Sequence, residues 1–312
     1  MISRIDANRK IVVCTTFREF NGDANDQIQR LFLSSLRKQT NQNYLLVVTI
    51  FKERNVEQVL KEGGVPFVIF QGDAGQHRFS FTHVMLNGIK VAKEFDDSIL
   101  VWTTCDMIFS EDFFTILLKK IKGDSCGTSY PHIIYSQIED FKQIRNNKYY
   151  WIGIDTIFFG SDSFRNTAFE ESVLRYPNYG WGHFEFFLSA LGLVYSKKML
   201  NFWPYTKLNK VENNRIEAKE TSEYLSSSDK INKLSFEKFM EDFNVDKNRG
   251  DLILSYQFHF INNWRMRSWI KKNSPYVIKK PFTYRDIKYR FLNKHIELYG
   301  LLKKIKGGIC NI

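Results

Sequence analysis

The chain has 312 residues and is 43% apolar and 16% aromatic, which is enough apolar material for one large folded domain. Its formal net charge is +11, and residues 265–312 account for all of it, with thirteen Lys and Arg residues against Asp286 and Glu297. Positive charge spread over the whole surface would suggest a nucleic-acid partner. Because residues 1–264 are neutral overall, such a partner is not favoured.

The sequence shows no apolar run of about 18 residues, so it predicts no membrane-spanning helix. Its polar start, residues 1–10, does not resemble a signal peptide. The cysteines lack the paired spacing of a disulfide framework or a zinc site. They are Cys14, Cys105, Cys126 and Cys310. We therefore expect a cytoplasmic protein with reduced thiols.

Strand and helix patterns alternate through the first third of the chain. Runs of β-branched and aromatic residues predict strands at 10–15, 44–51 and 66–71. Apolar positions at helical spacing predict helices at 28–36, 56–61 and 81–95. This alternation is typical of a doubly wound α/β fold with a mostly parallel sheet flanked by helices.

The second part of the chain is less regular. After a helix at 113–121, strand patterns occur at 125–130 and 151–159, and the apolar helix 184–193 follows a loop rich in glycine. Residues 206–250 are polar, and we expect a mobile insertion there with only a short helix at 236–243. We divide the chain into a core of residues 1–205, this insertion, and a C-terminal segment, 251–312, that forms a basic helical appendage.

One carboxylate, Asp106, interrupts the apolar run 100–109. Ligands of open α/β sheets collect beyond the carboxyl ends of the strands. An acid placed there can hold a metal ion or a sugar hydroxyl. The alternative is that Asp106 only faces water or caps the next helix.

Three segments in this order resemble the GT-A fold glycosyltransferases, in particular the large inverting family that includes bacterial polysaccharide and lipopolysaccharide enzymes. Residues 35–48 are similar to that family's first helix end and second strand. Residues 101–109 are similar to its D-x-D strand, and Gly180-Trp-Gly-His-Phe-Glu185 to its Gly-Trp loop with an acidic residue. The resemblance implies a nucleotide-sugar donor, with a UDP-sugar favoured, and a glycan or lipid-linked glycan acceptor.

The resemblance also implies a divalent metal, Mn or Mg. Asp106 matches the last Asp of D-x-D, which in the family binds the ion that bridges the donor diphosphate. Thr104 stands where the family has the first Asp. His259 resembles a C-terminal metal-binding His of several GT-A enzymes, although a His between two Phe residues can equally be a packed core residue.

The resemblance and the positions along the chain suggest roles for further side chains. Glu185 is the candidate catalytic base, and its alternative role is to complement the dipole of its helix. The candidate donor-binding residues follow predicted strands or lie near them: Thr15, Arg18, Asp73, Arg78, Thr104 and Asp106. The candidate acceptor-binding residues are Asp155, Trp181 and His183.

The sequence therefore predicts a glycosyltransferase of surface polysaccharide synthesis with inversion at the anomeric carbon. The alternative is a noncatalytic GT-A-like module that binds a nucleotide or glycan, which Thr104 favours. Aromatic residues interleave with the cations of residues 265–312, as in helices at the inner face of an anionic membrane. The alternatives for this segment are a helix that packs on the core and, less favoured, a surface that binds nucleic acid.

Overall fold

The computed structural model describes residues 10–22, 24–73, 75, 77, 79–129, 133–135, 148–149, 156–179, 184–202, 208–211 and 218–243. Within these ranges, no helix is both long enough and apolar enough to span a bilayer.

The described residues form a seven-stranded sheet in the order β10-β6-β9-β4-β1-β2-β3. Its strands are β1 (Lys10–Thr15), β2 (Tyr44–Ile50), β3 (Phe67–Gln71), β4 (Ser98–Thr103), β6 (Ser125–Ser129), β9 (Thr156–Gly160) and β10 (Lys198–Asn201). Each neighbouring pair is parallel except those that involve β9. The expectation of an α/β fold with a mostly parallel sheet is confirmed.

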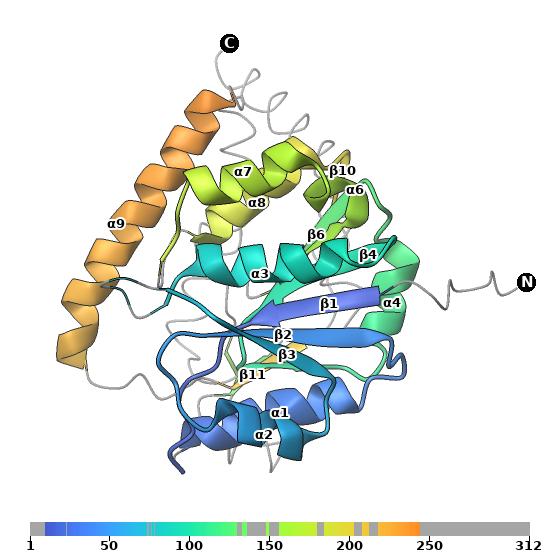
Figure 1. Ribbon diagram of the computed structural model, residues 1–312, viewed down its shortest axis with the longest axis vertical. Coiled ribbons are helices and arrows are strands. Elements are labelled where there is room, and N and C mark those ends of the chain that lie inside the picture. Colours follow the sequence, from blue (N-terminus) through green and yellow to red (C-terminus); the bar gives the residue numbers. More distant parts are fainter. Residues whose placement is uncertain are drawn as a thin grey trace, which may run out of the picture.

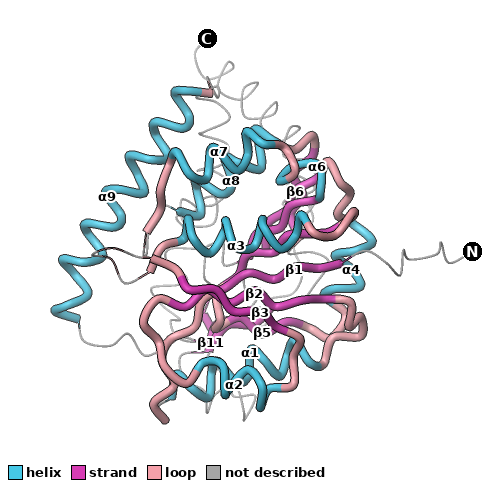
Figure 2. The backbone as a smooth tube through the Cα atoms, in the orientation of Figure 1, coloured by secondary structure: helices cyan, strands magenta, loops and turns pink. Residues whose placement is uncertain are grey.

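Helices cover both faces of this sheet, as Figures 1 and 2 show. Those packed on one face are α1 (Ala24–Arg37), α2 (Val56–Gly63) and α4 (Phe113–Lys120). Those on the other are α3 (Phe81–Lys93), α6 (Ser161–Phe164), α7 (Thr167–Arg175) and α8 (Phe184–Tyr195). The long helix α9 (Ala218–Asp242) runs along the side of α7 and α8.

Strand β1 shows how the sequence specifies the two layers. Ile11 and Val13 pack among α1, α2 and α4, whereas Val12 and Cys14 pack against α3. Both sets are fully buried, so this strand is apolar throughout rather than alternating, as expected for a parallel strand covered on both faces. On α3, a Cβ at Gly88 would lie 2.8 Å from Cys14 Cβ, and the glycine therefore permits the helix to approach the sheet closely.

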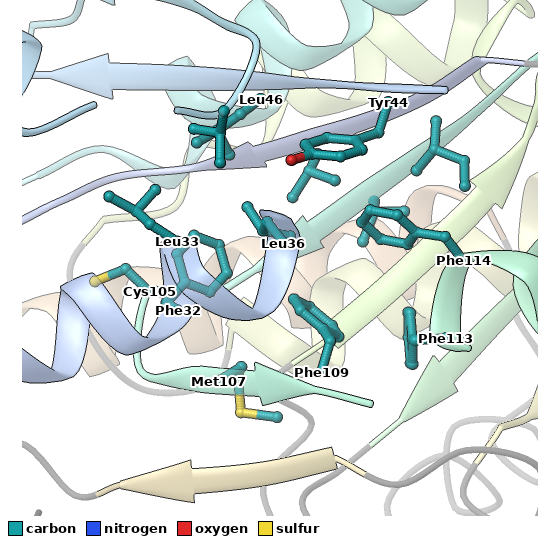
Figure 3. Packing of buried hydrophobic residues seen from close by; sticks show 14 of the residues in the cluster. Phe32, Leu33, Leu36, Tyr44, Leu46, Cys105, Met107, Phe109, Phe113 and Phe114 are labelled. Atoms are coloured by element: carbon teal, nitrogen blue, oxygen red, sulfur yellow. The ribbon is translucent and has the colours of Figure 1, made fainter. Parts of the chain in front are cut away.

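Aromatic side chains fill the layer between the sheet and the α1 face. Phe32 of α1 lies near Phe109, which in turn contacts Phe113 and Phe114 of α4 (Figure 3). The four rings are at most 4% exposed. Burial of one such ring contributes about 1.5–3 kcal/mol. This cluster therefore fixes the position of the segment that follows β4 on the α1 face of the sheet.

A second sheet has the order β5-β11-β7-β8. Its strands are β5 (Met107–Phe109), β7 (Ile133–Tyr135), β8 (Lys148–Tyr149) and β11 (Leu208–Val211). Because β11 pairs antiparallel with β5, Lys210 stands opposite Met107. This pairing brings a distant part of the chain to the residue that follows Asp106.

Two features were not predicted from the sequence. First, β9 is antiparallel to both β4 and β6, and the strand pattern at 151–159 carried no signal for its direction. A parallel pair of β6 and β9 would need a crossover connection that returns the chain to the same end of the sheet. The chain between them instead contains the short strands β7 and β8, and β9 pairs antiparallel with β6.

Second, part of the polar segment 206–250 forms regular elements, β11 and α9, where the sequence predicted only a short helix at 236–243. The buried stripe of α9 mixes Ser228, Asn232 and Ser235 with Phe236 and Phe239, at helical spacing. Apolar residues at helical spacing occur only near the end of this helix, so the sequence predicted only that part of it. The buried polar side chains of α9 make hydrogen bonds, which removes most of the cost of their burial.

These hydrogen bonds attach α9 to the strap, residues 176–179, that leads from α7 toward α8. The side chain of Asn232 accepts from Tyr179 N at 2.8 Å and donates to Tyr179 O at 2.9 Å. Ser235 Oγ donates to Pro177 O at 2.8 Å, and the Tyr176 hydroxyl donates to Asp242. The strap is therefore fixed along its whole length.

Candidate functional site

The main sheet has a topological switch point between β1 and β4. After β1 the chain adds β2 and then β3 on one side, and β4 then pairs with the opposite edge of β1. The carboxyl ends of these two parallel strands open into a cleft. Its lining residues are Thr15, Thr16, Phe17, Arg18, Glu53, Phe79, Phe81, Trp102, Thr103, Thr104, Cys105, Asp106 and Phe184. Ligands of open α/β sheets bind at this place.

One wall of the cleft is aromatic. The rings of Phe81, at the start of α3, and Phe184, at the start of α8, stack with centroids 3.7 Å apart. Trp102 at the end of β4 meets both of them, at 4.8 and 4.9 Å. Three elements thus converge on one apolar surface, which suits the flat face of a nucleobase or a sugar ring.

The loop after β1 is held by Gln29, a fully buried residue of α1. Gln29 Oε1 accepts from Arg18 N at 2.6 Å, and Gln29 Nε2 donates to Arg18 O at 3.4 Å. Both bonds are to the backbone, so they fix the path of the loop. Arg18 is itself one of the residues that line the cleft, and its side chain carries a positive charge.

Replacing Gln29 by Leu should therefore destabilise the protein by about 1–3 kcal/mol, because Arg18 N loses its acceptor in a partly buried position. Urea denaturation measures this as a lower midpoint with an unchanged m-value. Gln58→Leu on α2 is the control, since Gln58 makes an exposed contact with Glu62 and should be nearly neutral. Equal midpoints for Gln29→Leu and the wild type would contradict the role of Gln29.

Asp106 lies at the base of the cleft and is 4% exposed. Its Oδ1 accepts a hydrogen bond from the hydroxyl of Thr104, the residue that stands in place of the family's first Asp. Its Oδ2 lies 3.5 Å from Lys210 Nζ, and the side chains of this pair are 5% and 8% exposed. The carboxylate is therefore engaged by protein groups through both oxygens.

The other polar groups of the cleft are also constrained. Glu53 Oε2 accepts from the backbone N–H groups of Phe51 and Lys52, at 2.7 and 3.1 Å. Burial, and secondarily the negative charge of Asp106, raises the pKa of the Cys105 thiol to about 12. This thiol is protonated at neutral pH, so it is neither a nucleophile nor a thiolate ligand.

The residues around Asp106 do not fit a divalent cation. A metal ion about 2.1 Å from Oδ2 would lie within about 6 Å of the Lys210 ammonium. Two unit charges of like sign 4 Å apart repel by about 4 kcal/mol at an effective dielectric constant of about 20, and a divalent ion has twice the charge. Within the described ranges, no three His, Cys, Asp or Glu side chains gather around a common point. The expected ligand His259 lies outside the described residues.

The structure brings four of the predicted donor-binding residues together in the cleft: Thr15, Arg18, Thr104 and Asp106. Asp73 is exposed, accepts a hydrogen bond from Gly75 N, and is not one of the lining residues. Glu185 follows Phe184 directly in α8, and only its backbone is described. The remaining candidates, Arg78, Asp155, Trp181 and His183, lie outside the described residues.

Sequence reasoning missed several cleft residues. Phe79 lies just before α3 and Phe81 is the first residue of that helix, and the sequence predicted a helix at 81–95 without assigning either ring to a site. Glu53 lies in the loop that follows β2, and no motif in the sequence marked it as part of a site. Lys210 carried no local signal, because its contact with Asp106 depends on strand pairing across the chain.

The fold and this cleft define a doubly wound α/β protein with a cleft at its switch point. Solved structures that resemble the chain include the mannosyltransferase PcManGT from Pyrobaculum calidifontis in complex with GDP-Man and Mn²⁺, at 9% identity and a TM-score of 0.40, covering 84% of this chain and 83% of that one. Another is the inositol-1-phosphate CTP transferase from T. maritima, at 10% identity and a TM-score of 0.39, covering 70% and 95%.

A third similar structure is the bifunctional glycosyltransferase WbbM, at 15% identity and a TM-score of 0.36, covering 62% of this chain and 38% of that one. Glycosyltransferases, the class that the sequence motifs resemble, are thus among the structural neighbours. No protein-family model matches the chain, and the comparison with curated proteins finds no match.

Proposed function

We propose that the protein is a glycosyltransferase that binds a nucleotide-sugar donor in the switch-point cleft and transfers the sugar to a glycan acceptor with inversion. The observation that carries the proposal is the cleft itself, which combines an aromatic wall with Arg18 and Asp106 at the carboxyl ends of β1 and β4. An aromatic surface suits the base or the sugar, and a cation suits the diphosphate. A UDP-sugar is the favoured donor, and a bacterial surface polysaccharide is the favoured product.

The chemistry requires a base for the acceptor hydroxyl and positive charge for the departing diphosphate. Arg18, one of the residues that line the cleft, supplies the positive charge. Glu185 is the proposed base, because the residue before it, Phe184, lies in the cleft wall. Asp155, Trp181 and His183 are proposed on the acceptor side.

The second candidate function is a noncatalytic module that binds a nucleotide or glycan. The hydrogen bond from Thr104 to Asp106 favours it, since a hydroxyl stands where the family places a carboxylate. Nucleotide binding without sugar release or transfer would select this function.

The cytoplasmic location and the contact of residues 265–312 with an anionic membrane remain proposals, supported by the charge and aromatic content of that segment. The segment lies outside the described residues.

A panel of UDP, GDP and CDP, followed by the corresponding sugar nucleotides, tests the proposed function. One of these nucleotides at 100 times its Kd should raise the free energy of unfolding of the full chain by about 2.7 kcal/mol. Arg18→Met should weaken that binding by a factor on the order of 10 or more, because a charged contact to phosphate is lost. Arg30→Met is the control. Arg30 lies on α1 and makes an exposed ion pair with Glu62, so this variant should have the same nucleotide Kd as the wild type. If no nucleotide of the panel binds, the proposal is rejected.

A further inference from the structure

The carboxylate at the base of the cleft has its own counter-charge within the protein. We propose that Lys210 neutralises Asp106 and that the cleft thereby binds a nucleoside diphosphate without a divalent cation. This inference rests on the proposed function and concerns the cofactor requirement of the same site.

Backbone pairing places Lys210 beside Asp106. Strand β11 runs antiparallel to β5, and Val211 N donates to Asp106 O at 3.3 Å. The backbone of Lys210 is thus fixed in the second sheet beside that of Asp106. The Lys210 Nζ atom lies 3.5 Å from Asp106 Oδ2. Since both side chains are almost fully buried, water screens their attraction only weakly.

The charges at the cleft show why this pair matters for a diphosphate. Among the charged lining side chains, Arg18 is positive while Glu53 and Asp106 are negative. These three groups alone sum to a negative site, which would repel a diphosphate. Lys210 behind Asp106 cancels one negative charge, and backbone N–H groups stabilise Glu53. With Lys210 included, these four charges sum to zero, so the net negative charge that would repel a diphosphate is removed without an added cation.

The proposed transfer balances without a metal. The acceptor oxygen forms a bond to the anomeric carbon as the bond from that carbon to the diphosphate oxygen breaks. The electron pair of the broken bond stays on the nucleoside diphosphate, and the acceptor proton passes to the Glu185 carboxylate. The diphosphate leaves beside Arg18, with the charge of Asp106 already compensated.

The test measures the Kd of the full chain for UDP, GDP and CDP by calorimetry, once with EDTA and once with Mn²⁺. For the wild type, the Kd of the nucleotide that binds should agree within about twofold between the two conditions. Lys210→Met should weaken binding in EDTA by a factor on the order of 10 or more, because the charge of Asp106 is exposed to the diphosphate. Mn²⁺ should restore the binding of this variant, since Asp106 can then hold the ion.

The double variant Asp106→Asn/Lys210→Met separates charge compensation from loss of structure. It replaces the ion pair by two neutral side chains, so binding in EDTA should return to within about threefold of the wild type. Lys61→Met removes an exposed ion pair on α2 and is the control, with unchanged Kd in both conditions. If Lys210→Met does not fold, the double variant alone decides the question by its behaviour in EDTA.

Three results would overturn the inference while leaving the proposed function intact. They are wild-type binding that requires Mn²⁺, binding by Lys210→Met in EDTA equal to that of the wild type, and a double variant that binds only with Mn²⁺. A chain that binds none of the nucleotides in either condition overturns the proposed function, and this inference with it.

Discussion

Replacing Asp106 by Asn should destabilise the fold by about 3–5 kcal/mol, because it leaves the Lys210 ammonium buried without its counter-charge. The substitution keeps the size of the side chain, so the loss reports charge rather than packing. Chemical denaturation of the wild type and the variant at neutral pH measures the difference in free energy of unfolding.

The matched comparison is the double variant Asp106→Asn/Lys210→Met. Replacing both members of a buried ion pair by neutral groups is often close to neutral, so the double variant should recover most of the stability that either single change loses. The two single losses should therefore not add. Additive losses would show that Asp106 and Lys210 do not interact, and the ion pair would then have no part in the stability of the site.

Replacing Glu185 by Gln should lower turnover by a factor on the order of 10² or more while donor affinity stays nearly unchanged, as expected when a general base is lost. The measurements are kcat for sugar transfer and the Kd of the donor nucleotide. The anomeric configuration of the product should be inverted, which a single base and a single displacement require.

Glu237→Gln is the control for this change. Glu237 lies on α9, is exposed, and pairs only loosely with Lys233 at 3.9 Å. Its replacement should leave kcat and donor affinity as they are. If Glu185→Gln turns over as fast as the wild type, Glu185 serves only to complement the dipole at the start of α8, and the base must be sought elsewhere.

Local patterns were sufficient for the first half of the fold. Buried strands such as β1 and helices such as α3 have periodicities that tertiary structure did not override, and their order along the chain predicted the parallel sheet. The position of Asp106 after β4 followed from the same reasoning, because strand ends at a switch point meet in one place.

The rest depends on contacts that no local pattern contains. Lys210 reaches Asp106 only because β11 pairs with β5, which joins parts of the chain about one hundred residues apart. Helix α9 was missed because its buried face uses Ser228 and Asn232, whose burial is tolerated only with partners from other segments. The family resemblance likewise contained no signal for a lysine beside the carboxylate.

The hydrogen bonds from Asn232 and Ser235 of α9 hold the strap through its backbone atoms, so they do not depend on which side chains the strap carries at these positions. Asn232 bonds Tyr179 through the backbone N and O, and Ser235 bonds Pro177 through its carbonyl (α9 is labelled in Figure 1). Every amino acid carries the same carbonyl, and all but proline carry the same N–H. The side chain at position 179, which stacks on His77, can therefore be exchanged without loss of these anchors. Sequence changes at position 179, natural or in a laboratory library, can therefore alter the side chain before α8 while the backbone of the strap keeps its position.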